Sequence, residues 1–192
     1  MEENQEGLLL KARAGDRRAA ADLATQYGPE VYRLARYLLH SREEARDAAA
    51  DIFTRLYTAP QGIPLDKFRP WLMRVTYNHC MDILRRRKTL TRLLPKLYGR
   101  TTDRPEPGPE QAAVEAEEQE EVRQAVARLP EQERVIVVLR FYQQLSYAEI
   151  SSVLDIPEAT VGTRLHRARE KLRNMLAQKG GGAKGRAMPE SF

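Results

Sequence analysis

The sequence is poor in cysteine and in long apolar runs, and each scarcity excludes a class of protein. Cys80 is the only cysteine among the 192 residues, so no disulfide can form within the chain. Such a chain is expected in a reducing cytoplasm. No run approaches the roughly 18 apolar residues of a membrane-spanning helix, so no membrane insertion is expected. The acidic N-terminus offers only a short run of leucines, which does not make a signal peptide.

Groups that carry enzyme chemistry are also scarce. The histidines, His40, His79 and His166, and the single cysteine do not fall at the spacing of metal ligands. His79 and Cys80 are adjacent, and neighbours on a helix point in different directions, so they make a poor catalytic pair. No glycine-rich phosphate loop is present. We therefore expect no metal, no cofactor and no enzymatic activity.

Leucine, alanine, arginine and glutamate dominate, while β-branched residues are sparse and scattered, which predicts an all-α fold. Composition divides the chain into two small helical domains, residues 6–94 and 118–178. They are joined by a flexible linker over residues 95–117, which is rich in proline and glycine. The glycine-rich stretch 179–192 is expected to be a disordered tail.

Charge follows the same division. The chain has 32 basic and 27 acidic residues, a net charge of +5 and a pI near 9.4. Residues 1–95 hold 17 basic and 12 acidic residues, 96–130 hold 5 and 8, and 131–192 hold 10 and 7. Two basic modules joined by an acidic tether fit a polyanionic partner.

Turn and capping signals place helix boundaries in the first domain. Gly15–Asp16 and Gly28–Pro29 are expected to separate helices. A capping box that begins at Ser41 starts another helix, and residues 59–64 are expected to form a loop. The last helix of this domain is expected to begin just after that loop and to run to about Lys88.

The stretch SYAEISSVLDIPEATVGTRLHRAREKL, which begins at Ser146, has the pattern of a helix-turn-helix. Ser146 and Glu149 form a capping box, residues 155–157 break the first helix, and a second helix follows to about Leu176. A single helix over residues 131–144 is expected to precede the motif. The recognition helix of such a motif enters the major groove, where guanidinium groups reach guanine edges or phosphates. The alternative is an ordinary helical hairpin with solvated arginines. The side expected to face DNA carries Thr160, Thr163, Arg164, Arg167 and Lys171.

The stretch KFRPWLMRVTYNHCMDILRRRK, which begins at Lys67, interleaves aromatic and basic residues. This pattern suits single-stranded nucleic acid, because bases stack on aromatic rings while guanidinium groups hold phosphates. Asn78 is the candidate for reading the edge of an unpaired base, since an amide both donates and accepts hydrogen bonds. The alternative is that Phe68 and Trp71 belong to the core and that the run 85–88 is a solvated helix end.

A resemblance to bacterial RNA polymerase sigma factors of the extracytoplasmic-function type is carried by four stretches in order: ARDAAADIFTRLY, FRPWLMRVTYNHCMDILRRRK, LPEQERVIVVLRFYQQLSYAEI and IPEATVGTRLHRAREKLR. It implies that residues 6–94 are sigma region 2, which binds the β′ clamp helices of core RNA polymerase and melts the −10 element of promoter DNA. It also implies that residues 118–178 are sigma region 4, which binds the β flap and reads the −35 element as duplex. An anti-sigma factor is a further implied partner, and the cytoplasm, at the nucleoid, is the implied location.

The resemblance also implies roles for individual residues. The implied contacts to core polymerase are Asp47, Asp51, Phe53 and Leu56. The implied contacts to the −10 element are Phe68, Trp71, Arg74, Asn78, Asp82, Arg85, Arg86 and Arg87. The implied contacts to the −35 element are Thr160, Thr163, Arg164, His166, Arg167 and Lys171.

The sequence departs from the family pattern at Gly162, where lysine or arginine is usual, so one DNA contact is expected to be missing there. Asp155 replaces a turn glycine, and aspartate tolerates that conformation better than most residues.

Two other classes remain open at this point. A helix-turn-helix transcriptional regulator could act without being a polymerase subunit, although the first domain lacks the strand-like alternation of an α/β effector domain. A structural adaptor could use its helical domains only for protein contacts. Core polymerase separates these classes, because a sigma factor starts transcription with core enzyme, whereas a regulator needs a sigma factor already present and an adaptor binds no promoter DNA.

Overall fold

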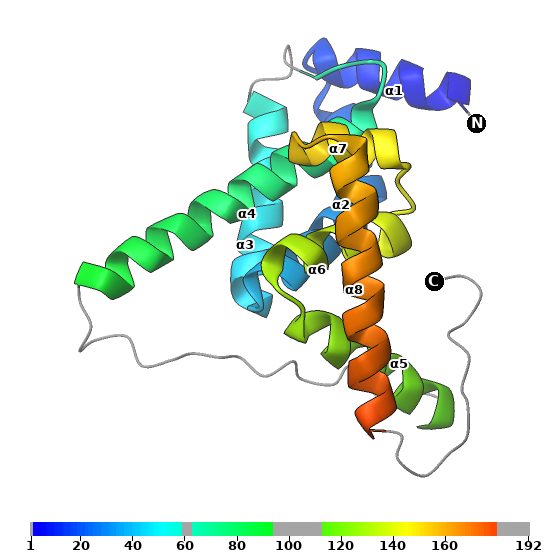
Figure 1. Cartoon of the computed structure of the whole chain (residues 1–192). Helices are drawn as coiled ribbons and strands as arrows, with labels where there is room; N and C mark the ends of the chain where they lie inside the picture. Colours follow the sequence, from blue (N-terminus) through cyan, green and yellow to red (C-terminus); the bar gives the residue numbers. More distant parts are fainter. Residues whose placement is uncertain (1, 59–62, 94–112, 180–192) are drawn as a thin grey trace. The chain divides into compact units, whose positions relative to one another are not determined.

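A computed structural model describes residues 2–58, 63–93 and 113–179, and its regular elements in those ranges are all helical (Figure 1). The predicted all-α fold is therefore confirmed. The chain divides into two compact units, Met1–Thr102 and Asp103–Phe192. Most of the predicted linker lies outside the described residues, but its last part, 113–117, belongs to a helix. The predicted tail lies outside the described residues beyond Lys179, which ends the last helix.

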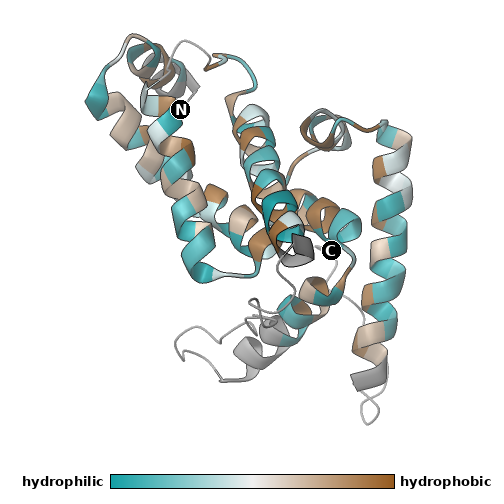
Figure 2. Cartoon of the chain, turned by 90° about the vertical axis from the view of Figure 1, so that its left-hand side faces the viewer, coloured by the Kyte–Doolittle hydropathy of each residue, from teal (hydrophilic) through white to brown (hydrophobic). Residues whose placement is uncertain are grey.

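The described residues of the first unit form four helices: α1 (Glu2–Arg13), α2 (Arg17–Leu39), α3 (Arg42–Thr58) and α4 (Phe68–Leu93). Helix α2 packs against each of the other three helices, so it lies at the centre of the unit. Figure 2 shows hydrophobic and hydrophilic residues alternating along the helices, as expected for elements that bury one side. The core side chains include Leu23, Leu34, Ile52, Leu72 and Met73.

The two boundaries predicted around α2 have different outcomes. The boundary at Gly15–Asp16 is confirmed: Gly15 has φ +91°, and the Asp16 carboxylate accepts hydrogen bonds from the first amides of α2 at 2.8 and 3.2 Å. The boundary predicted at Gly28–Pro29 is wrong, because α2 continues through both residues. Tyr27 and Val31 are buried on either side of exposed Pro29. Burial of that face outweighs the roughly 3 kcal/mol that a proline costs inside a helix.

Capping chemistry and backbone conformation set the next helix starts. The Ser41 hydroxyl oxygen accepts a hydrogen bond from the Glu44 amide at 3.3 Å, which is one half of the predicted capping box. Just before α4, Lys67 has a left-handed backbone conformation at φ +52°. Helix α4 then begins at Phe68 and ends at Leu93, beyond the predicted end at Lys88.

The second unit contains α5 (Ala113–Arg128), α6 (Glu131–Val137), the π-helical turn η2 (Val138–Tyr142), α7 (Tyr147–Leu154) and α8 (Glu158–Lys179). The helix predicted over residues 131–144 is present as α6 followed by η2, but it widens into a π-helical turn at its end and stops at Tyr142. Val138 and Leu139 are fully buried there, so core packing accompanies the wider turn. Arg134 closes the junction between α5 and α6 by donating from Nη1 to the carbonyl oxygens of Ala127 and Leu129, at 3.1 and 3.3 Å.

The predicted helix-turn-helix is present as α7, a short turn and α8. Both halves of the capping box form at the start of α7: the Glu149 amide donates to the Ser146 hydroxyl, and the Ser146 amide donates to the Glu149 carboxylate. Asp155 ends α7 in the left-handed conformation, at φ +54° and ψ +50°. The Ser151 hydroxyl donates to the carbonyl oxygen of Ile156 at 2.6 Å, which fixes the turn before α8.

Candidate nucleic-acid interface

One side of α4 carries a continuous stripe of polar and aromatic side chains at spacings of three and four residues, so its members lie on one helix face. All are exposed except Trp71, which is half-buried. The opposite side of α4 is buried and includes Leu72, Met73, Thr76 and Cys80. The core therefore fixes the orientation of the stripe. We call this set the α4 stripe: Trp71, Arg74, Asn78, Asp82, Arg85 and Thr89.

Phe68 does not join the α4 stripe, which corrects its predicted role as a contact to the −10 element. Its side chain is 2% exposed and its ring meets the Tyr27 ring edge-on. Trp71 also packs against Phe68, with ring centroids 5.9 Å apart. Phe68 is thus part of the core, which agrees with the alternative interpretation that the aromatic residues of this segment are core residues. Trp71 packs on that core but remains partly accessible.

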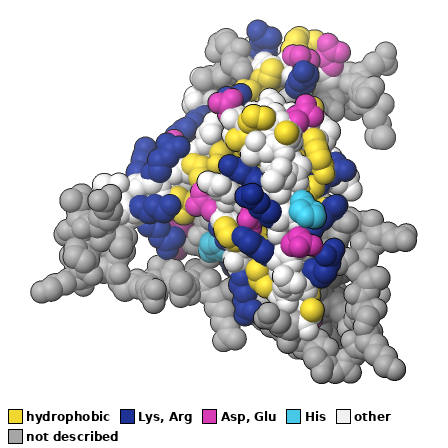
Figure 3. Space-filling model, viewed as in Figure 1, with side chains coloured by type: hydrophobic (Ala, Val, Ile, Leu, Met, Phe, Trp, Pro, Cys, Tyr) yellow, Lys and Arg dark blue, Asp and Glu magenta, His cyan; other side chains and the backbone are white. Residues whose placement is uncertain are grey.

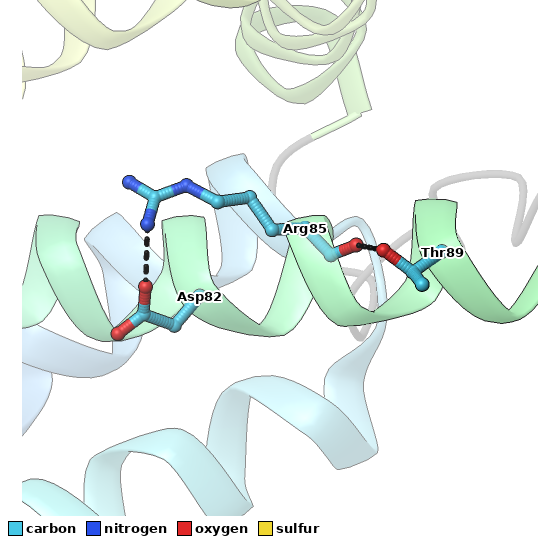
Figure 4. A network of polar contacts seen from close by, with 3 residues as sticks. All are labelled: Asp82, Arg85 and Thr89. Carbon is cyan, nitrogen blue, oxygen red and sulfur yellow. Dashed lines mark hydrogen bonds and ion pairs between the residues drawn. The ribbon is translucent and has the colours of Figure 1, made fainter.

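The cations predicted to hold the −10 backbone differ in their partners. Arg85 donates from Nη1 to Oδ1 of Asp82 at 2.9 Å, and its carbonyl oxygen accepts from the Thr89 hydroxyl at 3.1 Å (Figure 4). Arg87 is turned toward α3, where it lies 3.8 Å from the Glu44 carboxylate. Arg86 is exposed and forms no ion pair with the described residues. Figure 3 shows the Lys and Arg side chains that gather over α4 and along α8.

The predicted polymerase-docking residues lie on α3 with unequal exposure. Asp47 and Asp51 are exposed, and Phe53 is half-buried. Leu56 is only 8% exposed, because it packs into the core, so its predicted role as a surface contact is corrected to a structural one. Asp51 also reaches α4, where its Oδ2 lies 3.5 Å from Nε2 of His79.

Two groups on the buried side of α4 have shifted pKa values. Burial lowers the pKa of His79 from 6.5; the neighbouring Arg55 and Arg86 lower it further, while the carboxylates of Asp51 and Asp82 oppose the shift. Burial, with a smaller contribution from Glu44, raises the pKa of Cys80 to about 12. Cys80 is therefore a neutral thiol that packs as a small apolar residue.

The exposed side of α8 is centred on Thr163, His166 and Arg167, which lie within one turn of each other. Thr160 and Arg164 are half-buried at the margin of this face. The Thr163 hydroxyl donates back to the carbonyl oxygen of Ala159 at 2.9 Å, while no hydrogen bond to His166 or Arg167 is found in the described part of the chain. Arg167 is thus exposed and has no ion-pair partner among the described residues.

Lys171, another predicted DNA contact, is engaged within the second unit. Its Nζ donates to both carboxylate oxygens of Glu133 on α6, each at 2.8 Å. The Glu133 side chain is 12% exposed, so it depends on this cation for charge compensation. Sequence inspection missed Glu133, since nothing local links two residues on separate helices.

Gly162 leaves room beside the exposed face of α8. A Cβ atom at this position would lie 3.7 Å from Cε2 of Tyr147, which is ordinary contact. Tyr147 is exposed at the start of α7, and the guanidinium carbon of Arg140 lies 5.5 Å from its ring centroid. Arg140 in turn donates from Nη1 to the carbonyl oxygen of Leu145 at 2.9 Å. Tyr147 and Arg140 were not among the predicted site residues.

No helix among the described residues is long and apolar enough to cross a membrane. Within the same residues, no group of three or more histidine, cysteine or acidic side chains is arranged to hold a metal ion.

Two family models match the chain: Sigma-70 region 2 over residues 23–89, and Sigma-70, region 4 over residues 119–172. The chain is also 33% identical over 176 residues to the ECF RNA polymerase sigma factor SigW of Bacillus subtilis, an alignment that covers 88% of this chain and 94% of that protein. The chain belongs to the extracytoplasmic-function sigma factors of the sigma-70 family. This sigma factor directs promoter-specific transcription initiation by RNA polymerase. The alternative of a regulator that acts apart from polymerase is thereby set aside.

Other relatives agree with this assignment. The ECF RNA polymerase sigma factor SigM of Mycobacterium tuberculosis H37Rv is 32% identical over 177 residues, which covers 91% of this chain and 86% of that protein. The sigma factor fold recurs in solved structures. CnrH, solved in complex with the cytosolic domain of CnrY, has a TM-score of 0.67 at 23% identity and covers 92% of this chain and 99% of that chain. RpoE of Bartonella quintana, solved with the anti-sigma factor NepR, has a TM-score of 0.69 at 16% identity. That match covers 81% of this chain and 95% of the RpoE chain.

Proposed function

We propose that the two regions divide promoter recognition between α4 and α8. The α4 stripe captures an unpaired base of the −10 element beside Asn78 and holds the adjacent backbone through arginines. The exposed face of α8 reads the −35 element as duplex. The observation that carries this proposal is the α4 stripe itself, an amide placed between a half-buried indole and a basic helix end on one accessible face.

The role of α4 in strand opening is supported by its chemistry. An unstacked base loses a few kcal/mol of stacking and pairing, which the surface must return by stacking and hydrogen bonding. Trp71 supplies a ring of limited mobility because Phe68 supports it from below. Asn78 supplies a donor and an acceptor at an exposed position. Arg74 and Arg86 have no ion-pair partner among the described residues and so retain their full charge for phosphates.

The role of α8 in duplex recognition is supported by the helix-turn-helix geometry. The second helix of this motif lies in the major groove, and its first turns contact base edges. Thr163, His166 and Arg167 occupy that part of α8 and are exposed. Arg164, at the margin, is placed for the backbone or for a neighbouring base. Lys171 is reassigned to the structure of region 4, because Glu133 already holds its ammonium group.

The partners follow from the same division. We expect α3 to dock on the β′ clamp helices through Asp47 and Asp51, and region 4 to bind the β flap. An anti-sigma factor is expected to sequester the free protein; the similar sigma factor RpoE was solved in complex with the anti-sigma factor NepR, and CnrH in complex with the cytosolic domain of CnrY. The protein performs no bond chemistry of its own and acts in the cytoplasm, where it meets polymerase.

A transcription experiment tests the division between α4 and α8. Full-length protein and core RNA polymerase are incubated with a promoter library, and run-off products identify a responsive promoter. On that promoter, Asn78→Ala is expected to impair strand opening, measured by permanganate reactivity, more than it impairs binding to a closed duplex. Gln26→Ala, an exposed amide on α2, is the matched control. Equal loss of opening and duplex binding in Asn78→Ala would count against the proposal.

A second measurement tests α8. Arg167→Ala is expected to weaken holoenzyme binding to a duplex that carries the −35 element by roughly 1–3 kcal/mol if the arginine reads a base bidentately, with the preference lost at one position. A phosphate contact would weaken all sequences alike and lower the salt slope by about 1. Arg173→Ala is the control, since Arg173 pairs with Glu170 further along the helix. No effect of Arg167→Ala on any duplex would exclude this face of α8.

A further inference from the structure

Asp82 is the one carboxylate of the α4 stripe, and its position is unexpected for a surface that binds a polyanion. It lies one turn after Asn78 and one turn before Arg85 on the same face. Its side chain is 55% exposed, so it lies within the surface that we propose for the opened strand. A fixed negative charge there repels any phosphate that approaches Asn78.

The ion pair between Asp82 and Arg85 contributes little to stability. Both side chains are more than half exposed, at 55% and 74%, and they are three residues apart on one helix. Exposed pairs of this kind contribute little, because solvent screens the two charges and holding two long side chains in one geometry costs entropy. The main effect of the pair is therefore on the availability of Arg85 for DNA. The Arg85 guanidinium already has an acceptor 2.9 Å away in the free protein (Figure 4).

The basic end of α4 is thus partly neutralised before any DNA arrives. Arg85 is engaged by Asp82 and Arg87 by Glu44, while Arg86 and Lys88 have no ion-pair partner among the described residues. A nucleic acid bound through its phosphates alone must replace Asp82 as the partner of Arg85. The unpaired Asp82 carboxylate then lies close to the negatively charged strand. A strand that also offers an unpaired base gains the contacts of Trp71 and Asn78, which offset this penalty.

We propose that Asp82 is a specificity-determining residue of the melting surface. Asp82 keeps its ion pair with Arg85 when a nucleic acid is held by its phosphates alone. The ion pair breaks, and Arg85 binds the strand, when an unpaired base occupies the site beside Asn78. Asp82 thereby lowers the affinity for duplex and for unrelated single strands more than the affinity for the −10 strand. This inference rests on the proposed function of α4.

The decisive variant is Asp82→Asn, which keeps the size of the side chain and one acceptor oxygen but removes the charge. Asp22→Asn is the matched control, because Asp22 is exposed on α2 and has no ion pair with the described residues. Both variants raise the net charge of the full chain by one. Holoenzyme binding is measured on three probes over a range of salt: a single strand with the −10 element, a scrambled single strand, and a duplex without promoter elements.

Asp82→Asn is expected to tighten binding to the scrambled strand and to the duplex about three- to tenfold at moderate salt, with a salt slope steeper by about 1. Binding to the −10 strand is expected to change less, so the ratio of specific to non-specific affinity falls. In an Arg85→Ala background the same substitution should change the slope much less, because only the direct repulsion between Asp82 and phosphates is then removed. An unchanged ratio, or equal effects of Asp82→Asn and Asp22→Asn, overturns the inference.

Asn78→Ala in the same assay separates the two proposals. If Asn78→Ala reduces preference for the −10 strand while Asp82→Asn does not alter it, the role of α4 stands and the role of Asp82 fails. If Asn78→Ala leaves the preference intact, the proposed function of α4 itself fails. Circular dichroism melting of each variant shows whether the fold is kept, which an exposed position predicts.

Discussion

The ring of Phe68 meets the ring of Tyr27 edge-on, with centroids 5.1 Å apart and planes at 75°. This contact joins the first turn of α4 to the middle of α2, and both side chains are almost fully buried. It is one of the contacts that hold α4 against α2, and it therefore helps to orient the α4 stripe. An aromatic residue that looked suited to DNA therefore acts through the core.

Substitution of Phe68 is expected to lower stability without a specific effect on DNA. Phe68→Ala removes a buried ring and should reduce the free energy of unfolding of region 2 by about 3–5 kcal/mol. Phe68→Leu, which keeps much of the volume, should fold and melt promoter DNA normally at moderate temperature. Trp71→Ala should cost less stability but weaken binding to the −10 strand. Urea unfolding and strand-binding assays on the three variants measure both effects. Weakened −10 binding by the folded Phe68→Leu protein would contradict the core assignment.

The ion pair of Lys171 with Glu133 is expected to stabilise region 4 rather than to bind DNA. Lys171→Ala leaves the Glu133 carboxylate nearly buried without its cation, which should lower the free energy of unfolding by about 1–3 kcal/mol. Replacing both residues by apolar ones of similar size should restore much of that loss. The salt slope of duplex binding should change less for Lys171→Ala than for Arg167→Ala. A larger slope change for Lys171→Ala would return this residue to the DNA interface.

The left-handed backbone at Asp155 makes a prediction about the turn of the helix-turn-helix. At φ +54°, a residue such as alanine, which has a Cβ atom and no polar side chain to hydrogen-bond locally, is strained by about 1–2 kcal/mol, whereas glycine is not. Asp155→Gly should therefore be neutral or slightly stabilising, and Asp155→Ala should lower the melting temperature of region 4. Thermal unfolding compares the two. If alanine is tolerated as well as glycine, the turn does not require this conformation.

The lowered pKa of His79 predicts that region 2 loses stability in mild acid. The unfolded chain binds a proton near pH 6.5, whereas folded His79 stays neutral to a lower pH. The unfolded state then holds more protons, so the free energy of unfolding decreases as pH falls below 6.5 and levels off below the folded pKa. His79→Asn should reduce this dependence while His166→Asn, which alters an exposed residue, should not. Urea unfolding between about pH 5 and pH 8 measures this pH dependence of the free energy of unfolding. Identical profiles for His79→Asn and the unsubstituted protein would refute the prediction.

Local signals predicted the elements that depend on neighbouring residues. The capping box at Ser146, the Asp16 cap and the break at Asp155 all involve side chains within a few positions of the backbone that they contact. Such chemistry is visible in the order of residues alone. The helix-turn-helix and the direction of its accessible face followed from the same local patterns.

Features that depend on distant partners could not be predicted in this way. Pro29 looks like a helix end, yet packing of the residues around it against the other helices keeps α2 continuous. Phe68 looks like a DNA contact until its position against Tyr27 is known. Lys171 looks accessible until Glu133, 38 residues away in sequence, is placed beside it. In each case tertiary packing, which the local pattern does not show, decides the outcome.

The burial of Cys80 has a practical consequence for work on this protein. A thiol with a pKa of about 12 and no exposed surface offers no thiolate to a maleimide reagent while region 2 is folded. A new cysteine at an exposed position in each region could therefore accept a fluorophore selectively, with the native residue left in place. Energy transfer between the two dyes would then follow how far apart the regions move when polymerase is added.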